Sequence, residues 1–374
     1  MENNNFVEVS RITLSIHHGL TQTALELLKK IGIYTVMLES ARTARLRIKN
    51  TLLDFLGLSD PIEDSPTDII RIAVNPDDGE KIVSYLIEKL DLKTAGRGAI
   101  YVQNLQEMSN RTLPVINLEH HNKITLLHDL TLITGIQSQS GSGESISKVA
   151  LKLGAGVPTV SLGKGTGIRD RLGLLRITIS PEKELTYLLV PSFDANGLQN
   201  LLIEKGKLNR PGGGFMYQTP IKFGLADTQL RIGYQTHAAS LEQVIAAIDE
   251  IKKDTSWRKR IFDNDGESGL PHKTNYTHKE ISFICPVEHS DDYIHAAMDN
   301  GAAGATMTIM RSVSLKEEDS YEVNNFENAI MCVKKEDENK VIEAIIKTSE
   351  EKNESDWMIQ KIPASSIYAT YKKK

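Results

Sequence analysis

The chain has 374 residues, of which 40% are hydrophobic and 25% charged, and its formal net charge is −5. Its length exceeds the size at which one core keeps growing, so we expect two or three globular domains. Lysines and arginines are spread along the chain, which argues against nucleic acid as a partner. No apolar run reaches the roughly 18 to 20 residues of a membrane span, and the amino terminus lacks the pattern of a signal peptide. We therefore expect a cytoplasmic protein whose membrane contacts, where they occur, are made through a partner.

Residues of the types that bind metals are few or unsuitably spaced. The two cysteines, Cys285 and Cys332, each lie within an apolar run, which favours small buried side chains over a disulfide or a metal site. His120 and His121 are adjacent, and neighbouring side chains on a strand point to opposite faces. No acidic or cysteine partner follows them at a ligand spacing, so we predict an exposed connector and no metal cofactor.

The first segment, residues 6–104, alternates between the periodicities of strands and helices. In chain order the predicted elements are the strand SRITLSIHH, a helix with Leu25, Leu28 and Ile31, the strand YTVMLES, a long insertion, the strand DIIRIAVNP, a helix with Ile82, Leu86 and Leu90, and the strand GAIYVQ. This order is βαββαβ, the ferredoxin-like arrangement of an α+β fold.

The same order recurs twice, in residues 125–222 and in residues 277–370. The second segment contains LTLITGI, a helix with Ile146, Val149 and Leu153, VPTVSL, an insertion, ELTYLLVPS, a helix with Leu198, Leu201 and Leu202, and GFMYQ. The third contains ISFICPV, a helix with Ile294, Ala297 and Met298, ATMTIM, an insertion, NAIMCVKK, a helix with Val341, Ile342 and Ile345, and WMIQKIP. Each pass takes about a hundred residues, a normal domain size, and indicates three tandem repeats.

Residues 223–276 join the second and third segments and contain one extra predicted helix. Ser240 and Gln243 form a capping box at its start. An apolar stripe that ends at Ile251 predicts that this helix packs against a sheet. The rest of the stretch reads as a flexible linker.

Two loops rich in glycine precede the last strand of the first two segments, in KTAGRGAIYV and NRPGGGFMYQ. Glycine costs backbone entropy, so its use there implies a left-handed turn or a close approach of the backbone to another group. A tight turn alone explains one such loop. Two loops at equivalent places favour a second interpretation, in which consecutive N–H groups bind an anion such as phosphate.

Taken in order, these motifs resemble the PII signal-transduction proteins and their PII-like relatives. In that family a threonine opens the second strand, as Thr35, Thr159 and Thr306 do here. The second strand then runs into a long T-loop with a glycine-rich start, matched by GKGTGIRDRLG, and the glycine loop before the last strand is the B-loop. The insertion ARTARLRIKNTLLDFLGLSDPIEDSPT in the first segment leaves a mobile loop and a folded docking surface as alternatives.

The resemblance implies an arrangement, a ligand and a set of binding residues. Family members form triangular trimers, so three repeats in one chain imply an intrachain pseudo-trimer that is a monomer in solution. An adenine nucleotide (ATP, ADP or AMP) is the implied ligand, with a second small anion left open. The residues implied to bind it are Gly96, Arg97, Gly98, Thr159, Gly163, Gly165, Thr166, Gly167, Arg210, Gly212, Gly213 and Gly214.

The third repeat departs from the family pattern, since no glycine lies near Ser355 and Asp356 where its B-loop is expected. Asp356 would repel phosphate, so we expect that cleft to bind no nucleotide. The family also places arginines after the last strand, and Arg111 and Arg231 fall at comparable distances here.

Three classes of function are compatible with these patterns. The resemblance favours a regulatory protein without catalytic activity, which binds nucleotide and controls a transporter or an enzyme through its T-loops. An enzyme that holds a phosphorylated substrate is the second class, although no nucleophile with a base and no GxxxxGK[ST] motif is present. The third class is a structural scaffold in which the glycines serve only as turns.

Overall fold

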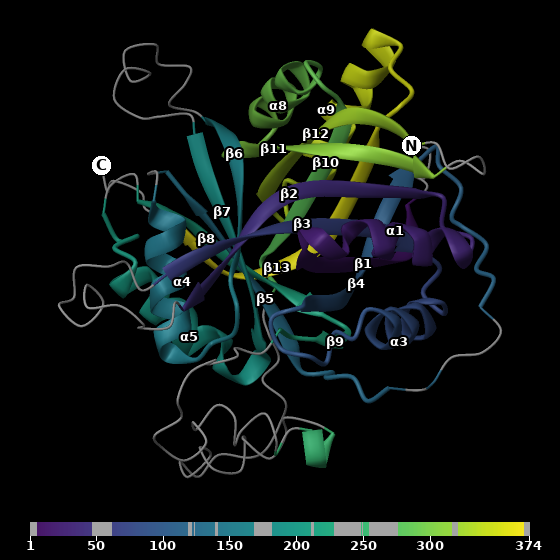
Figure 1. Cartoon of the computed structure of the whole chain (residues 1–374). Helices are drawn as coiled ribbons and strands as arrows, with labels where there is room; N and C mark the ends of the chain where they lie inside the picture. Colours follow the sequence, from purple (N-terminus) through teal and green to yellow (C-terminus); the bar gives the residue numbers. More distant parts are fainter. Residues whose placement is uncertain are drawn as a thin grey trace, which may run out of the picture.

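The computed structural model shows a mixed α+β protein built around a large antiparallel sheet (Figure 1). The residues described are 6–46, 62–118, 122, 124–138, 141–167, 182–210, 213–227, 248, 250–253, 276–315 and 321–369. Within them the strands form one 13-stranded sheet, and the strand pairings are antiparallel.

The first segment contains four strands and two α-helices. Its elements are β1 (Val7–His17), the short 3-10 helix η1 (His18–Leu20), α1 (Thr21–Lys30), β2 (Thr35–Leu46), β3 (Ile62–Val74), α3 (Gly79–Lys89) and β4 (Gly98–Ser109). β1 pairs with both β3 and β4, and β2 pairs with β3, so the strand order is β2-β3-β1-β4. The two ends of the insertion predicted at residues 41–67 are therefore strands, and the ladder from Ala41 to Leu46 pairs with residues 62–67.

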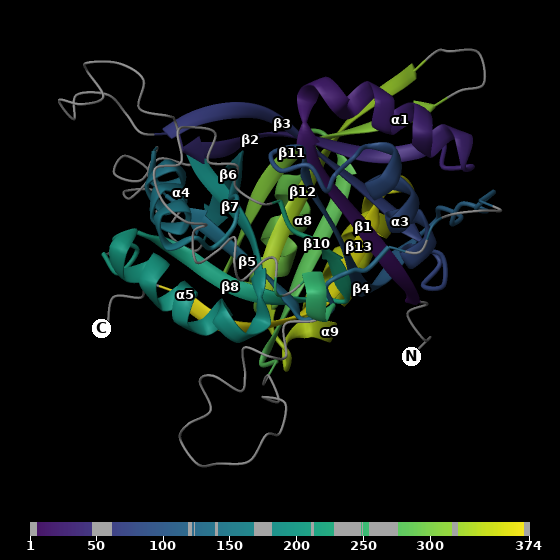
Figure 2. The same ribbon diagram turned by 60° about the horizontal axis from the view of Figure 1, so that its bottom comes forward.

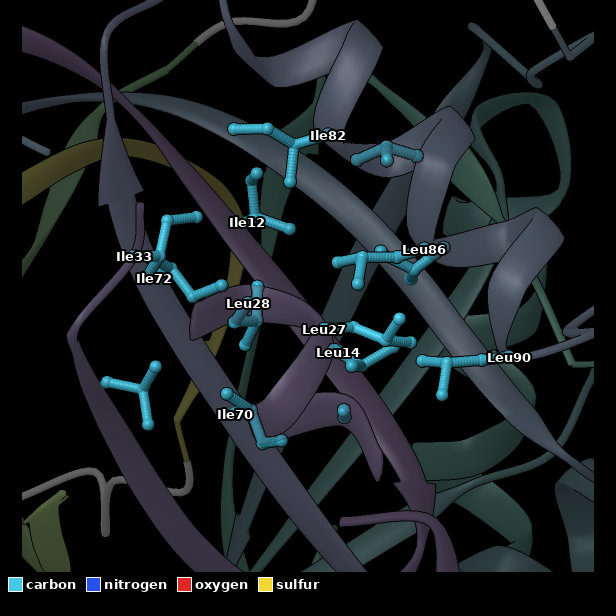
Figure 3. Close-up of a cluster of buried hydrophobic side chains, with 14 of the residues drawn as sticks. Ile12, Leu14, Leu27, Leu28, Ile33, Ile70, Ile72, Ile82, Leu86 and Leu90 are labelled. Atoms are coloured by element: carbon cyan, nitrogen blue, oxygen red, sulfur yellow. The ribbon is translucent and has the colours of Figure 1, made fainter. Parts of the chain in front are cut away.

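The helical spacing of leucine and isoleucine determines how the two helices cover this sheet. Leu28 on α1 and Ile82 and Leu86 on α3 are fully buried, because these positions lie on the face turned toward the strands. They pack against Ile12 and Ile70, which point from β1 and β3 to the same side (Figure 3). Burying each such side chain contributes about 1.5–3 kcal/mol.

The second and third segments repeat this order of elements and pairings. The second has β5 (Leu130–Gln137), α4 (Ser142–Leu153), β6 (Thr159–Gly167), β7 (Glu182–Pro191), α5 (Ser192–Lys205) and β8 (Gly214–Ile221), in the strand order β6-β7-β5-β8. The third has β10 (His278–Pro286), α8 (Ser290–Asp299), β11 (Gly304–Leu315), β12 (Tyr321–Lys334), α9 (Glu338–Lys352) and β13 (Met358–Ala369), in the order β11-β12-β10-β13. The helix pairs lie outside the strands (Figures 1 and 2).

The strand that follows the first helix of each segment contacts its counterparts in both other segments. β2 pairs with β6, with Thr43 opposite Thr159. β6 pairs with β11, with Gly165 opposite Thr306, and β11 pairs with β2. Figure 2 shows the three strands together near the centre of the molecule. Corresponding elements therefore meet in all three pairs of segments.

The last strands form a second set of joints between segments. The start of β13 pairs with the end of β4, with Met358 opposite Ser109. The short strand β9 (Phe223–Leu225), which follows β8, pairs with the start of β4, with Ile100 opposite Leu225. The end of β13 pairs with the start of β8. In each joint, the chain at the end of one segment lies against the start of another segment's last strand.

Polar side chains fill part of the space where the three segments meet. The guanidinium of Arg11 donates to Gln103 at 2.8 Å and to Gln360 of the third segment at 3.0 Å. The hydroxyl of Tyr217, from the second segment, donates to Glu280 of the third at 2.8 Å. These groups are buried, so their hydrogen bonds offset the cost of removing them from water. The contacts fix the orientation of the segments relative to one another.

Parts of the predicted connectors fall outside the described residues, including His120, His121 and the capping box at Ser240 and Gln243. Ile251 is described and is 79% exposed. The prediction that the apolar stripe of the extra helix packs against a sheet is therefore wrong at this position, because the surrounding structure does not cover it. Among the helices that the structure describes, none is long and apolar enough to cross a membrane.

Candidate functional site

A small cavity of about 10 Å³ lies where the first and second segments meet, and we call this place the first cleft. Its volume is close to that required by one water molecule. The lining residues are Ser15, Ile16, His17, Thr43, Thr67, Gly96, Arg97, Gly98, Ala99, Val157, Thr159 and Asp227. The fold therefore brings together the glycine loop of the first segment and the threonine that opens β6 of the second.

The glycine loop requires glycine for two different reasons. Gly96 has φ +78° and Gly98 has φ +144°, and residues other than glycine rarely adopt these backbone angles. A Cβ added at Gly98 would also lie 2.2 Å from the carbonyl oxygen of Ser15 on β1. Of the two alternatives that the sequence left open, a left-handed turn and a close approach, Gly98 shows a close approach, and the group approached is the neighbouring strand.

The backbone amide of Gly96 donates a hydrogen bond of 2.7 Å to Oδ1 of Asp227. Asp227 lies in the connector that follows the second segment, two residues after β9, and is 9% exposed. A carboxylate of the chain itself thus lies against the loop that was predicted to bind an anion. Arg97 lines the cavity, and its Nε donates to the carbonyl oxygen of Leu90 at 2.8 Å, which fixes the start of its guanidinium against its own loop.

Four buried hydroxyl groups complete the first cleft. Ser15 and Thr159 lie 3.0 Å apart (Oγ to Oγ1) and join β1 to β6 across the boundary between the segments. Thr43 and Thr67 lie 2.6 Å apart (Oγ1 to Oγ1) within the paired parts of β2 and β3. The cleft is therefore bounded by polar groups that both donate and accept hydrogen bonds.

A buried carboxylate orders the start of the first helix beside this cleft. Oδ2 of Asp68 accepts from the hydroxyl of Thr21 at 2.6 Å and lies 2.6 Å from Nδ1 of His18. Glu184 occupies the corresponding place in the second segment, where it accepts from the amide of Gly143 near the start of α4 and from Arg42 of β2. Carboxylates at these positions interact favourably with the positive, amino-terminal ends of the helix dipoles.

The second glycine loop has the same geometry as the first at its last residue. Gly214 begins β8 as Gly98 begins β4, and an added Cβ would lie 2.6 Å from the carbonyl oxygen of Ile136. Gly213 donates to the carbonyl of Arg210 at 2.8 Å, and a Cβ on Gly213 would lie 2.5 Å from the carbonyl oxygen of Leu208. Arg210 is exposed, and Gly212 lies outside the described residues.

The glycine-rich start of the predicted T-loop is an extended strand. Gly163, Gly165, Thr166 and Gly167 form the end of β6 and pair with β11 of the third segment. A Cβ on Gly163 would lie 2.6 Å from the carbonyl oxygen of Met307. The glycines therefore allow two segments to approach closely at this point. These four residues are not among those that line the first cleft.

The third segment presents an acidic residue where the first presents glycine. In the joints between segments, Met358 of β13 pairs with Ser109 in the same way as Ile100 of β4 pairs with Leu225, so Met358 and Ile100 are equivalent. Asp356 and Gly98 each lie two residues earlier and are therefore equivalent too. Oδ1 of Asp356 accepts from the guanidinium of Arg111 at 3.0 Å. Arg111 is the first of the two arginines expected after a last strand, and it contacts a protein carboxylate; Arg231 lies outside the described residues.

In the described part of the chain, neither the cysteines nor the other residues that commonly bind metals form a further candidate site. Cys285 and Cys332 are free thiols there, and burial raises the pKa of Cys285 to about 12. A thiol with so high a pKa is a poor nucleophile at neutral pH. The described residues contain no group of three or more histidine, cysteine or acidic side chains placed to hold a metal ion.

Sequence reasoning missed Ser15, Thr43, Thr67 and Asp227 as parts of the cleft. No local motif marks them, because each reaches the cleft through strand pairing with a distant part of the chain. Comparisons of this chain with protein-family models, with curated proteins and with solved structures found no match.

Proposed function

We propose that the chain is an intrachain pseudo-trimer of three ferredoxin-like repeats, related in design to the PII signal-transduction proteins. The recurring βαββαβ order and the repeated strand order of the three segments support this. The mutual pairing of β2, β6 and β11 supports a threefold arrangement, since identical subunits in a ring also meet through equivalent elements.

The proposed ligand is an adenine nucleotide, and the proposed site is the first cleft. One observation carries this assignment: a single cavity is lined by Gly96, Arg97 and Gly98 of one segment and by Thr159 of the next. Backbone N–H groups in such a loop are suited to a phosphate, and threonine hydroxyls are suited to a base or a sugar. The cavity holds about one water molecule, so nucleotide binding requires the cleft to widen.

A regulatory role without catalysis fits the contacts inside the cleft. Ser15 and His17 both line it, but the hydroxyl of Ser15 bonds to Thr159, and Nδ1 of His17 accepts from the amide of Gly19. Among the described residues no hydrogen bond joins Ser15 to His17, so this pair lacks the link between nucleophile and base that hydroxyl activation needs.

The cleft also lies beside the ends of the long insertion of the first segment. Thr43 and Thr67 line the cavity and belong to the strands that flank residues 47–61. A ligand that contacts Thr43 and Thr67 favours the arrangement of β2 and β3 to which it binds best and thereby changes the surface offered to a transporter or an enzyme. This is the proposed route from nucleotide binding to regulation.

Nucleotide binding predicts thermal stabilisation and a dependence on Thr159. At a concentration a hundredfold above its Kd, a nucleotide that binds only the folded protein stabilises it by about 2.7 kcal/mol. We expect ATP, ADP or AMP to raise the Tm. In calorimetry, Thr159→Val should weaken binding by about three- to tenfold, because one hydrogen-bonding hydroxyl is lost.

Thr348→Val is the matched control, since the Thr348 hydroxyl donates to Ala344 within α9. This variant should bind nucleotide like the unmodified protein. If none of the three nucleotides changes the Tm or produces heat on binding, the proposed ligand is wrong.

The pseudo-trimer predicts that one chain is the complete particle. The three segments already cover one another through β2, β6 and β11, so further copies are not needed to bury these strands. Light scattering should give a mass near 41.6 kDa, that of a single chain. A stable trimer of chains at micromolar concentration would contradict the arrangement.

A further inference from the structure

Asp227 holds the position at which the first glycine loop would receive an anion. Its Oδ1 lies 2.7 Å from the amide nitrogen of Gly96, within the range of a charge-assisted hydrogen bond. The side chain belongs to a residue that is 9% exposed and that lines the cavity. A phosphate placed on this amide would meet a fixed negative charge at hydrogen-bonding distance.

The chain that carries Asp227 is anchored a short distance away. In β9, Gly224 exchanges backbone hydrogen bonds with Leu127, and Phe223 pairs with Val102 of β4 and packs into the core of the first segment. Asp227 follows this anchor by two residues. A small displacement of residues 226–227 would therefore remove the carboxylate from the loop without separating β9 from β4.

The joint between the first and third segments is equivalent to this one, but there the incoming side chain is basic and the loop is acidic. Ser109 pairs with β13 in the same way as Leu225 pairs with β4, so these two residues are equivalent. Arg111 lies two residues after Ser109, and Asp227 lies two residues after Leu225, so Arg111 and Asp227 are equivalent as well. Arg111 contacts Asp356 at 3.0 Å. In both joints the incoming side chain complements the loop that it meets: an arginine meets an acidic loop, and an aspartate meets a loop of N–H donors.

We infer that Asp227 is an internal competitor for the anionic group of the ligand in the first cleft. The inference rests on the proposed nucleotide site and adds how that site is regulated. A phosphorylated ligand must displace the carboxylate from Gly96, whereas an uncharged nucleoside does not need this amide. The competitor therefore lowers the affinity for ATP and leaves the affinity for adenosine nearly unchanged.

The test compares Asp227→Asn with Asp77→Asn, using ATP and adenosine as probes in calorimetry. Asparagine keeps the size and an acceptor oxygen, but it removes the negative charge. Asp77 is exposed, lies beyond the carboxyl end of β3 and does not line the cavity, so its variant makes the same change in net charge away from the cleft. We expect D227N to bind ATP about tenfold more tightly or better, since removing a like charge next to phosphate is worth roughly 1.4 kcal/mol or more.

Two further measurements locate the effect. Adenosine affinity should change by less than about twofold in D227N, because no like charge is relieved for an uncharged ligand. Hydrogen exchange of the amides in residues 94–98 should be faster in Asp227→Ala, which removes the acceptor of the Gly96 N–H. Adding Thr159→Val to D227N should reverse part of the gain for ATP, which assigns that gain to the first cleft.

The outcomes separate this inference from the function on which it rests. If the unmodified protein binds ATP and D227N binds it equally well, Asp227 is not a competitor, and the nucleotide site stands. An equal gain in D77N would show a general effect of net charge and would also overturn the inference. If neither the unmodified protein nor D227N binds ATP, both the proposed ligand and the competitor role are wrong.

Discussion

Gly98→Ala is expected to lower the free energy of unfolding by about 2–5 kcal/mol, from backbone strain together with overpacking. The residue has φ +144°, and a Cβ would lie 2.2 Å from the carbonyl oxygen of Ser15 and 2.8 Å from the side chain of Ile16. Both neighbours belong to β1, the strand that pairs with β3 and β4, so neither can retreat without disturbing the sheet of the first segment. Chemical denaturation followed by circular dichroism measures the change.

Gly197→Ala is the matched control for this prediction. Gly197 lies inside α5, and nothing lies within 4 Å of the place where its Cβ would be. Because alanine loses less backbone entropy in a helix, this variant should be more stable by about 0.5–1 kcal/mol. A Gly98→Ala protein as stable as the unmodified chain would contradict the tight packing of the loop against β1.

Arg71→Met is expected to cost about 3–5 kcal/mol, because it leaves the buried carboxylate of Glu39 without its partner. Nη1 of Arg71 lies 2.5 Å from Oε2 of Glu39, whose side chain is 2% exposed. Burial opposes the charge of Arg71 and is the largest single influence on its pKa, but Glu39 together with Tyr187 and Tyr101 raises the pKa of Arg71 above its ordinary value. The guanidinium also lies over the ring of Tyr187 from the second segment, 5.8 Å from its centroid.

The double variant Arg71→Met/Glu39→Leu separates the loss of the pair from the loss of packing. Replacing both charges by apolar groups of similar size is often neutral or stabilising, since neither charge then remains buried. We therefore expect the double variant to regain most of the stability lost in Arg71→Met, as measured by urea denaturation. A double variant as unstable as the single one would show that packing against Tyr187, and not the unpaired carboxylate, sets the cost.

Regular spacing made the helices predictable. Leu25, Leu28, Ile82 and Leu86 recur at helical intervals, and the structure buries all four against the first sheet. Leu153 also follows the spacing, yet it is 46% exposed, because it is the last residue of α4 and lies just before the left-handed turn at Gly154. Periodicity thus predicts that a helix forms, but it does not predict which of its end residues the neighbouring structure covers.

The glycines show a different limit. The pattern of residues left a left-handed turn and a close approach as alternatives for the two glycine loops, and at Gly98 and Gly214 a strand carbonyl oxygen lies close to where a Cβ would be. For Gly163 and Gly165, the resemblance to PII proteins implied the base of a loop, but these residues are part of the ladder between β6 and β11. A glycine indicates that something lies close to the backbone, and only the packed chain shows whether that group is a ligand, a loop or a strand.

The local features of this protein can be read from the order of its residues: the succession of strands and helices, the apolar faces of the helices and the glycines at the starts of β4 and β8. These depend on spacing and backbone conformation over a few residues. Three features depend on how the whole chain packs: β2, β6 and β11 pair with one another, Thr159 lies beside Ser15, and Asp227 contacts Gly96. The last two contacts join residues separated by 144 and 131 positions, and no local preference of the chain encodes which distant group will lie opposite.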